Sequence, residues 1–290
     1  MKRESFGSRL GFILVSAGCA IGIGNVWKFP YICGAYGGAA FILIYLCFLV
    51  ILGIPVLVAE FAVGRGSHTS VAKCFDKLAP AGNCWKPLKI IGIIGCYMLM
   101  MFYTTVGGWM IYYCVKSLRG DFVGATPEAV TQSFSDMLGN APTMMLWMVI
   151  ICLIGFAVCF MGLQNGIEKI SKVMMSALLI IMVILAVHSV MMEGAGEGIR
   201  FYLIPDFQKI KEAGVGNVVF AALSQSFFTL SIGIGAMLIF GSYLDKSRSL
   251  TGEAVSITVL DTFVALTAGF IIIPCLLYTS PSPRDKRQSR

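Results

Sequence analysis

The chain has 290 residues, of which 57% are hydrophobic and only 13% are charged, whereas about 25% of the residues in soluble domains are charged. This composition excludes an ordinary water-soluble domain and predicts an all-α membrane protein. The formal net charge of +7 does not indicate a nucleic-acid partner, because the Lys and Arg residues are concentrated in the loops of one side, as in membrane proteins whose N-terminus is cytoplasmic. We therefore expect a multi-pass protein of the plasma or inner membrane, in contact with the lipid bilayer.

Seven stretches are apolar enough to cross about 30 Å of hydrocarbon, which takes about 20 residues in a helix. They run from Leu10 to Phe29, Ala39 to Ala59, Ile90 to Val115, Thr143 to Leu163, Val173 to Met192, Ala213 to Leu244, and Ala254 to Pro274. Short connections are expected near residues 34–38 and 164–166, and longer loops at 65–89, 117–142 and 193–216. We expect one transmembrane domain over residues 1–274, followed by a polar tail at 275–290 that is foreign to the protein or marks a truncation.

The first span carries Gly18, Gly22, Gly24 and Asn25 at the depth where a transmembrane helix should be most regular. Each glycine costs about 1 kcal/mol relative to alanine inside a helix. One interpretation is close packing between helices through small residues. The other is a helix that is unwound at Gly22-Ile23-Gly24 and lines a cavity, where its freed backbone groups find partners.

The sixth span favours the second interpretation. Its segment Ser231-Ile232-Gly233-Ile234-Gly235 interrupts a long uncharged run at a corresponding depth, and paired interruptions point to the binding site of a transporter. Freed carbonyls near Gly18, Ala20 and Ile21 can coordinate a small hard cation, and the half-helix ends present a positive dipole to an anionic group. An amino-acid carboxylate fits this arrangement.

Two carboxylates stand out. Asp261 lies in the last span, where a charge costs about 2.5 to 3.5 kcal/mol and is functional by default, although a structural hydrogen-bonded carboxyl is the alternative. With Asn25 and Thr229 it would supply the oxygen ligands that hard cations prefer. Glu60 ends the second span, where it is either a residue at the membrane edge or an acceptor for the amides freed around Gly233 and Gly235. We favour the acceptor.

The remaining candidates carry less information. Tyr103 and Phe228 lie in apolar helices, where an aromatic residue packs more often than it binds. His68 and His188 lack neighbouring ligands for a metal. The chain contains no nucleophile-and-base set and no His-Glu-x-x-His pattern, so we do not expect an enzyme.

Several motifs occur together between residue 9 and about residue 274: Arg9-Leu10-Gly11-Phe12, the run from Gly18 to Pro30, Gly37-Gly38-Ala39-Ala40-Phe41, Gly53-Ile54-Pro55 with Glu60 and Gly64-Arg65, and the run from Gln225 to Gly233. This set resembles the neurotransmitter:sodium symporter family. The resemblance implies an inverted-repeat sodium symporter fold with discontinuous first and sixth helices, in which seven spans are present here: the first repeat and the start of the second. It also implies sodium as a co-transported ion and no organic cofactor.

The resemblance implies a set of site residues. The first sodium ion would bind Ala20, Asn25, Thr229 and Asp261, and the second Gly18 and Ile21 together with residues of an eighth span. The substrate would contact Cys19, Ala20, Gly22, Gly24, Leu99, Tyr103, Phe228, Thr229, Ser231 and Ile234, with Tyr103 bonded to its carboxylate. Lys28, Glu60 and Gln225 are the expected gate or structural residues.

Three positions refine the expected function. Monoamine carriers of this family have Asp in place of Gly22, so glycine here indicates an amino-acid carrier. Lys28 replaces the more frequent Arg of the outer gate and pairs as a point charge without Arg's planar fork. Asp261 replaces the Asn of chloride-dependent members, and because it would itself carry the negative charge, we expect coupling that is independent of chloride.

The leading hypothesis is sodium-coupled uptake of a neutral aliphatic or aromatic amino acid by alternating access. One alternative is a proton-coupled carrier with the same inverted-repeat architecture. The other is a membrane receptor or scaffold that does not transport, in which the glycines only pack helices. Without an eighth span, we expect the 290-residue chain to be transport-incompetent.

Overall fold

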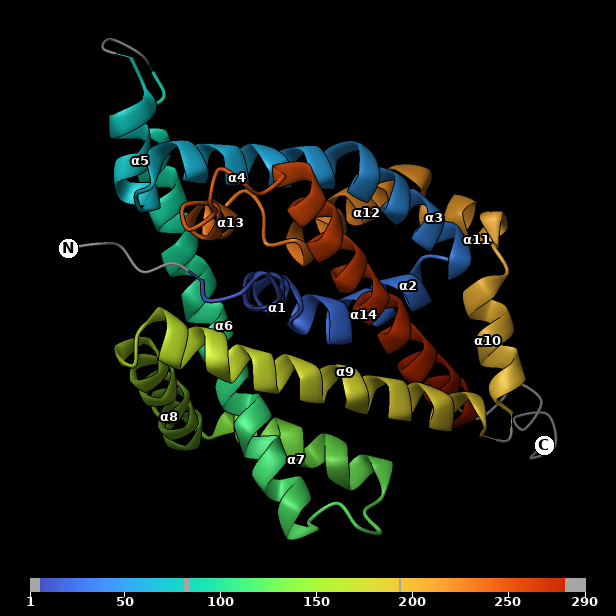
Figure 1. Cartoon of the computed structure of the whole chain (residues 1–290). Coiled ribbons are helices and arrows are strands. Elements are labelled where there is room, and N and C mark those ends of the chain that lie inside the picture. Colours follow the sequence, from blue (N-terminus) through green and yellow to red (C-terminus); the bar gives the residue numbers. More distant parts are fainter. Residues whose placement is uncertain (1–5, 81–83, 193, 280–290) are drawn as a thin grey trace, which may run out of the picture.

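A computed structural model describes residues 6–80, 84–192 and 194–279, and all regular secondary structure in these ranges is helical (Figure 1). The α-helices are α1 (Arg9–Ala20), α2 (Phe29–Ala35), α3 (Ala39–Phe48), α4 (Ile54–Ser67), α5 (Val71–Leu78), α6 (Leu88–Arg119), α7 (Pro127–Gly139), α8 (Ala141–Phe160), α9 (Lys169–Val190), α10 (Ala195–Leu203), α11 (Phe207–Ala213), α12 (Val215–Thr229), α13 (Ala236–Gly241) and α14 (Leu250–Thr279). Three π-helical segments join some of them: η1 (Gly24–Lys28), η2 (Leu49–Gly53) and η3 (Leu163–Glu168).

Within the described residues, five helices are long and apolar enough to cross a membrane. They cover Ala39–Ser67, Leu88–Arg119, Ala141–Phe160, Leu163–Val190 and Leu250–Cys275. The pair Arg9–Ala20 and Gly24–Ala35 is bent by 54° and makes a sixth if it is one span. The remaining predicted span, from Ala213 to Leu244, contains the shorter apolar helix Val215–Thr229, because the chain leaves the helical conformation after Thr229.

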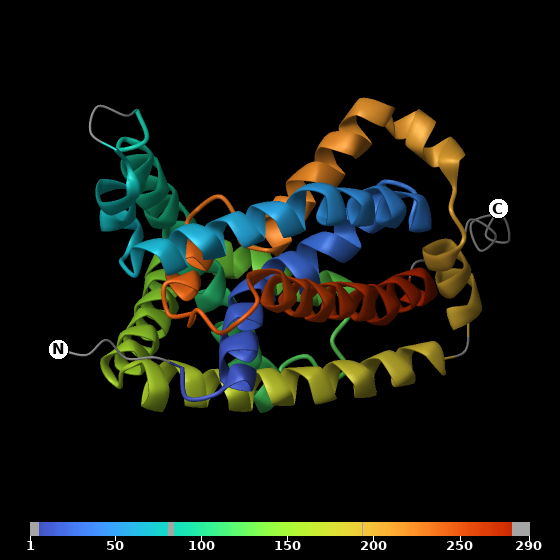
Figure 2. The same ribbon diagram turned by 45° about the horizontal axis from the view of Figure 1, so that its top comes forward.

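Helix α14 runs through the middle of the molecule, between α3 and α4 on one side and α9 on the other (Figures 1 and 2). It packs against α1, α4, α9 and α10, and buried apolar residues of these helices form one core around it. Helices α6 and α8 pack mainly against each other, and their apolar side chains are largely exposed.

Helix α1 begins at a side-chain cap and stops in mid-sequence. The Ser8 hydroxyl accepts the Gly11 amide at 3.0 Å, as Ser does before a first helical turn. After Ala20, Ile21 takes an extended conformation with ψ 104°, and helical backbone resumes close to Gly24. The bend therefore falls at Ile21 and Gly22, whereas Ile23 and Gly24 of the predicted break, Gly22-Ile23-Gly24, are already helical.

The segment between α12 and α13 is a series of turns from Leu230 to Gly235. Its path requires positive φ at Ser231 (51°), Gly233 (91°) and Gly235 (80°). Glycine adopts such values without the steric cost that a Cβ adds. The two glycines thus explain why the chain turns here, and Ser231 adopts a conformation that is rare for residues other than glycine.

Several loop predictions need correction. The connection expected at residues 164–166 lies inside η3, and the chain turns instead at Gly162, whose φ is 84°. The longer loops contain α5, α7, α10 and α11. Thr126 caps α7 by accepting the Ala129 amide at 3.3 Å, with Pro127 in its first turn. This Thr-Pro pattern is a recognised signal for a helix start. Most of the expected tail, residues 280–290, lies outside the described residues.

Candidate functional site

The most buried polar cluster contains Asp261 of α14, Asn25 of η1 and Thr229 of α12, all with an exposed fraction of 0%. Asn25 Nδ2 donates to Asp261 Oδ1 at 2.8 Å and to the Asp261 carbonyl at 3.1 Å. Thr229 Oγ1 donates to Asp261 Oδ2 at 2.8 Å. Each oxygen of the buried carboxylate therefore has a donor, which is the condition for burying such a group.

Two more side chains connect the two interrupted segments. Gln225 Nε2 donates to the Gly24 carbonyl at 3.0 Å, and Ser231 Oγ donates to the Cys19 carbonyl at 3.0 Å. The Cys19 carbonyl lies in the last turn of α1, just before the break, and the Gly24 carbonyl lies at the start of η1, where it also accepts the Phe29 amide. The Ser231 hydroxyl, in a residue with positive φ, thus gives the Cys19 carbonyl at the end of α1 a hydrogen-bond partner.

Glu60 of α4 contacts the turn segment before α13. Its Oε1 accepts the Gly233 amide at 2.6 Å, and its Oε2 accepts the Leu238 amide at 3.2 Å. The first partner is the amide that the sequence indicated, and the second lies three residues beyond the expected Gly235. One carboxylate thus bonds to backbone amides on both sides of Gly235, and bonds to a charged acceptor are about twice as strong as neutral ones.

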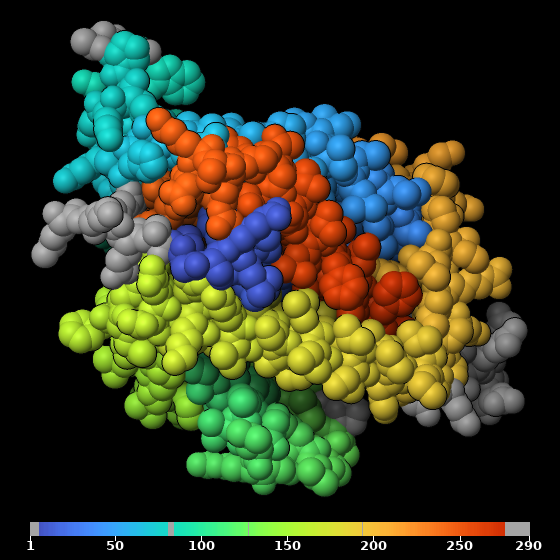
Figure 3. Space-filling model, viewed as in Figure 1, coloured from blue at the N-terminus to red at the C-terminus, as the bar shows by residue number. Residues whose placement is uncertain are grey.

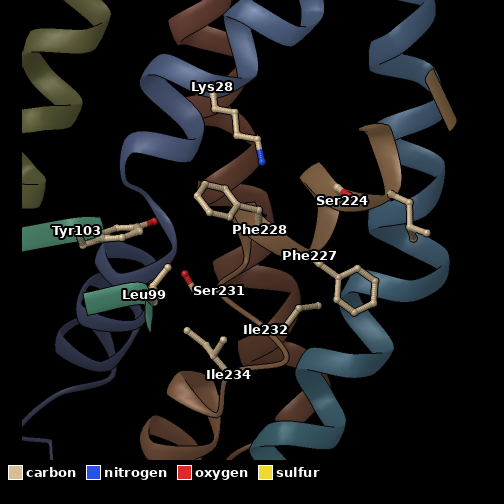
Figure 4. Close-up of a pocket in the computed structure, with 10 residues that line it drawn as sticks. Lys28, Leu99, Tyr103, Ser224, Phe227, Phe228, Ser231, Ile232 and Ile234 are labelled. Carbon is tan, nitrogen blue, oxygen red and sulfur yellow. The ribbon is translucent and has the colours of Figure 1, made fainter. Parts of the chain in front are cut away.

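A cavity of about 530 Å³ is lined in part by Phe228, the residue before Thr229 of the Asp261 cluster. Its volume lies within the range of about 300–1,000 Å³ that is usual for small-molecule sites. Figure 4 shows Tyr103 and Leu99 of α6 facing Ser231 and Phe228 across it, with Ile234 below. The lining residues are Lys28, Leu99, Tyr103, Leu223, Ser224, Phe227, Phe228, Ser231, Ile232 and Ile234.

Lys28 and Phe228 form the upper part of this cavity. Lys28 Nζ lies 4.1 Å from the centroid of the Phe228 ring, and Figure 4 shows its side chain directed toward that ring. This is a cation–π contact, which holds an ammonium group over the face of an aromatic ring. The contact joins η1, which contains Lys28, to the end of α12, which contains Phe228.

The predicted substrate residues divide into three groups. Five of them line the cavity: Leu99, Tyr103, Phe228, Ser231 and Ile234. Four more lie at the break of the first helix or next to it: Cys19, Ala20, Gly22 and Gly24. A Cβ at Gly22 would meet open space, whereas one at Gly24 would lie 2.8 Å from the Phe228 ring. Thr229 belongs to the Asp261 cluster.

The predicted cation ligands also fall into two places. Ala20 and Ile21 are buried at the break, close in sequence to Asn25. Gly18 lies one turn earlier and packs on α9, because a Cβ there would be 3.2 Å from Met175 Sδ. The structure thus brings Asn25 and Thr229 into direct contact with Asp261.

Four lining residues were missed by sequence reasoning: Leu223, Ser224, Phe227 and Ile232. The first three precede Phe228 on α12 by five, four and one residues. Residues three or four apart share one face of a helix, so Ser224, Phe227 and Phe228 lie on neighbouring positions of one face of α12. This spacing could have identified Ser224 and Phe227 once Phe228 was a candidate.

Many secondary transporters bind their substrate where two interrupted helices meet. The model of the "Sodium:neurotransmitter symporter family" matches residues 3–137 and 127–286. The chain therefore belongs to this family, which comprises transporters and not enzymes, and it is a multi-pass membrane protein.

Individual relatives agree with this assignment. The uncharacterized sodium-dependent transporter YhdH of Bacillus subtilis is 34% identical over 98% of this chain and 62% of its own length. An uncharacterized sodium-dependent transporter of Haemophilus influenzae is 32% identical over 95% of this chain and 61% of its own length. A crystal structure of MhsT in complex with L-phenylalanine matches with a TM-score of 0.87 and 37% identity, over 97% of this chain and 63% of that one. The chain thus spans about three fifths of the length of these relatives.

Proposed function

We propose that this chain carries the central sodium and substrate site of a symporter for neutral amino acids with aliphatic or aromatic side chains. Membership of the sodium symporter family supports the ion and the class of protein. The observation that carries the proposal is the buried cluster of Asp261, Asn25 and Thr229 beside the cavity. Its side chains offer only oxygen ligands and one negative charge to a cation, and hard cations prefer such ligands.

The cation would bind at the break itself. Ala20 stands where the first helix ends, and its carbonyl would add to the oxygens of Asn25, Thr229 and Asp261. A second sodium ion would use the carbonyls of Gly18 and Ile21. Because Asp261 is a fixed negative charge, we propose that coupling does not require chloride.

The substrate class follows from the cavity walls. Leu99, Phe228 and Ile234 are apolar and would enclose an aliphatic or aromatic side chain. A substrate carboxylate would reach the Tyr103 hydroxyl, and the open space beside Gly22 leaves room for the amino-acid backbone. The related MhsT is known in complex with L-phenylalanine, which supports an amino acid of this kind.

The finer architecture is part of the same proposal. We infer that residues 1–274 form seven spans of an inverted-repeat fold, with α1 to α2 as the discontinuous first span and α12 to α13 as the discontinuous sixth. The N-terminus would lie in the cytoplasm of a cell with this protein in its plasma or inner membrane. Substrate would then enter by alternating access around the two interrupted spans.

Binding of radiolabelled L-phenylalanine to the purified protein tests the proposal. We expect binding in sodium chloride and in sodium gluconate, little binding in choline chloride, and loss of binding in Asn25→Ala and Asp261→Ala. Leu10→Ala is the matched control, because Leu10 is 62% exposed and far from the cluster along α1. Binding that follows pH instead of sodium would favour the proton-coupled carrier. Binding that is unchanged in both alanine variants would reject the site.

A further inference from the structure

A second cavity, of about 430 Å³, lies between α4, α5, the start of α6 and the turns before α13. Its volume is that of an ordinary small-molecule site. The space-filling view shows α5 and the chain next to it at one edge of the molecule, adjacent to α13 (Figure 3). Ile234 is the residue that lines both this cavity and the substrate cavity described above.

The inner wall of this cavity is mainly apolar. Val71 of α5 and Leu238 of α13 pack together and are 7% and 4% exposed. Gly235 makes room for α5, because a Cβ there would lie 2.7 Å from Val71 Cγ2. Glu60 is the charged residue of the wall, and its two oxygens accept the Gly233 and Leu238 amides. The cavity therefore suits an apolar group that leaves these bonds intact.

The open end of the cavity also carries large apolar side chains. Trp85 is 59% exposed, Leu88 39% and Ile91 66%. Trp85 lies in the turn before α6, a helix that is long and apolar enough to cross a membrane. Tryptophan is enriched where membrane-spanning helices meet the polar headgroups. We therefore place the opening at the boundary between hydrocarbon and headgroups, where an acyl chain can enter from the bilayer.

Basic residues lie next to this opening. Residues 65–89 contain five Lys or Arg and one acidic residue, Asp76. Lys89, which follows Leu88 of the cavity wall, donates from Nζ to the two oxygens of Asp76 at 2.8 and 2.7 Å. Lys86 is exposed and, within the described ranges, takes part in no ion pair. Basic clusters next to a membrane-spanning helix attract anionic lipids.

We propose that the cavity holds one acyl chain of an anionic phospholipid, with the phosphate bound by Lys86 and Lys89. An ammonium group has three donors, so Lys89 can bind a phosphate oxygen while it keeps its two bonds to Asp76. In the orientation proposed above, this loop faces the cytoplasmic leaflet, whose surface is negative. The headgroup thus meets the two lysines, and the chain fills the apolar interior beside Ile234.

Quenching of tryptophan fluorescence by brominated lipid tests this site, because a bromine atom quenches a tryptophan that it contacts. The 290-residue protein is reconstituted in phosphatidylcholine vesicles with increasing amounts of brominated phosphatidylglycerol. Trp85 is one of four tryptophans, so its signal is the difference between the parent and Trp85→Phe. We expect half-maximal quenching at an amount about 25-fold below that of brominated phosphatidylcholine, from two lysines that each contribute about fivefold. Equal quenching by the two lipids would overturn the proposal.

Substitutions next to the opening should shift this response in both directions. Lys86→Gln should raise the amount for half-maximal quenching about fivefold, and Asp76→Asn should lower it, because Lys89 then has no competing carboxylate. Lys73→Gln is the matched control. Lys73 is exposed and lies two residues from Val71 on α5, so it is on the opposite face of the helix. An equal effect of Lys73→Gln and Lys86→Gln would mean that a diffuse surface charge attracts the lipid, and would overturn the site.

Ala59→Phe tests the acyl chain. Ala59 is exposed and lines the cavity, so a phenyl ring there would fill the space without entering the core. We expect Ala59→Phe to lose the preference for brominated phosphatidylglycerol at Trp85, although both lysines remain. Ala59→Ser, which adds little volume, should behave like the parent. An unchanged preference in Ala59→Phe would show that no chain occupies the cavity.

An effect on the substrate rests on the proposed function. A chain against Ile234 would restrain the turns at residues 230–235, and a second ligand binds an ordered segment at a lower entropic cost. We expect L-phenylalanine to bind the parent at least about fivefold more tightly with phosphatidylglycerol than with phosphatidylcholine alone, and Lys86→Gln to lose most of this gain. Equal affinity would overturn the effect. Absence of L-phenylalanine binding in both lipids would refute the proposed function, and the quenching of Trp85 would still decide the lipid site.

Discussion

Replacing Asp261 by Asn removes one negative charge from the buried cluster and preserves its size. Asp261 is fully buried, and its two oxygens accept Asn25 Nδ2 and Thr229 Oγ1, both at 2.8 Å. Truncating one partner of a buried charge pair costs about 2–5 kcal/mol. At about 1.4 kcal/mol for each factor of ten, sodium should bind Asp261→Asn at least about 30-fold more weakly than it binds the parent.

Sodium-dependent stabilisation of the purified protein measures this difference. A ligand present at 100 times its Kd stabilises the folded state by about 2.7 kcal/mol. At the same sodium concentration, a 30-fold weaker site would contribute only about 0.9 kcal/mol. Asp121→Asn is the matched control, because Asp121 lies in an exposed turn after α6. It should retain the full stabilisation.

Two results would refute the reasoning about Asp261. One is equal sodium stabilisation of Asp261→Asn and the parent, which would mean that the carboxylate does not face the ion. The other is a strict requirement of the parent for chloride, seen as loss of sodium stabilisation in gluconate. In that case the fixed charge of Asp261 would not serve in place of an anion.

Three further substitutions test the surroundings of the site. Glu60→Gln should lower the free energy of unfolding by about 1–3 kcal/mol, because the carboxylate that accepts Gly233 and Leu238 loses its charge; denaturant unfolding would show it, and an unchanged midpoint would contradict it. Gly22→Ala should leave stability unchanged, since its Cβ meets open space, and weaken L-phenylalanine binding; equal affinity would place the substrate elsewhere. Gly241→Ala should destabilise by about 1–3 kcal/mol through overpacking, because its Cβ would lie 2.6 Å from Phe61 Cα; a wild-type midpoint would show that α4 and α13 can separate.

The sequence was informative where a residue is costly in its expected place. Asn25 and Asp261 are polar residues in apolar spans, and they contact each other although they are 236 positions apart. Their burial predicts a shared partner, because an isolated buried charge is expensive. Gly233 and Gly235 were informative because glycine is unfavourable inside a helix. In the structure both residues have a positive φ, which is unfavourable for other residues.

Other features could not be read from composition or periodicity. Leu223 and Ile232 line the cavity as ordinary apolar residues, and nothing in their type separates them from core residues. The chain turns at Gly162, before the connection expected at residues 164–166. Those residues belong to η3, which forms its own backbone bonds and continues into α9. Glu168 and Glu253 lie near the ends of predicted spans, where acidic residues are usually solvated, and only the fold shows that both are buried.

Hydrogen bonds join the segment around the bend at Ile21 and Gly22 to the segment around the turns at Leu230–Gly235, and the Asp261 carboxylate bonds to both segments. Gln225 and Ser231 donate to the carbonyls of Gly24 and Cys19, and Asp261 accepts from Asn25 and Thr229. A change that separates the segments would expose buried polar groups at every one of these contacts, each at a cost comparable to a lost hydrogen bond. A cation and a zwitterion at this place would offer these groups alternative partners. We therefore expect ligand binding and separation of the two segments to compete for the same hydrogen-bonding groups.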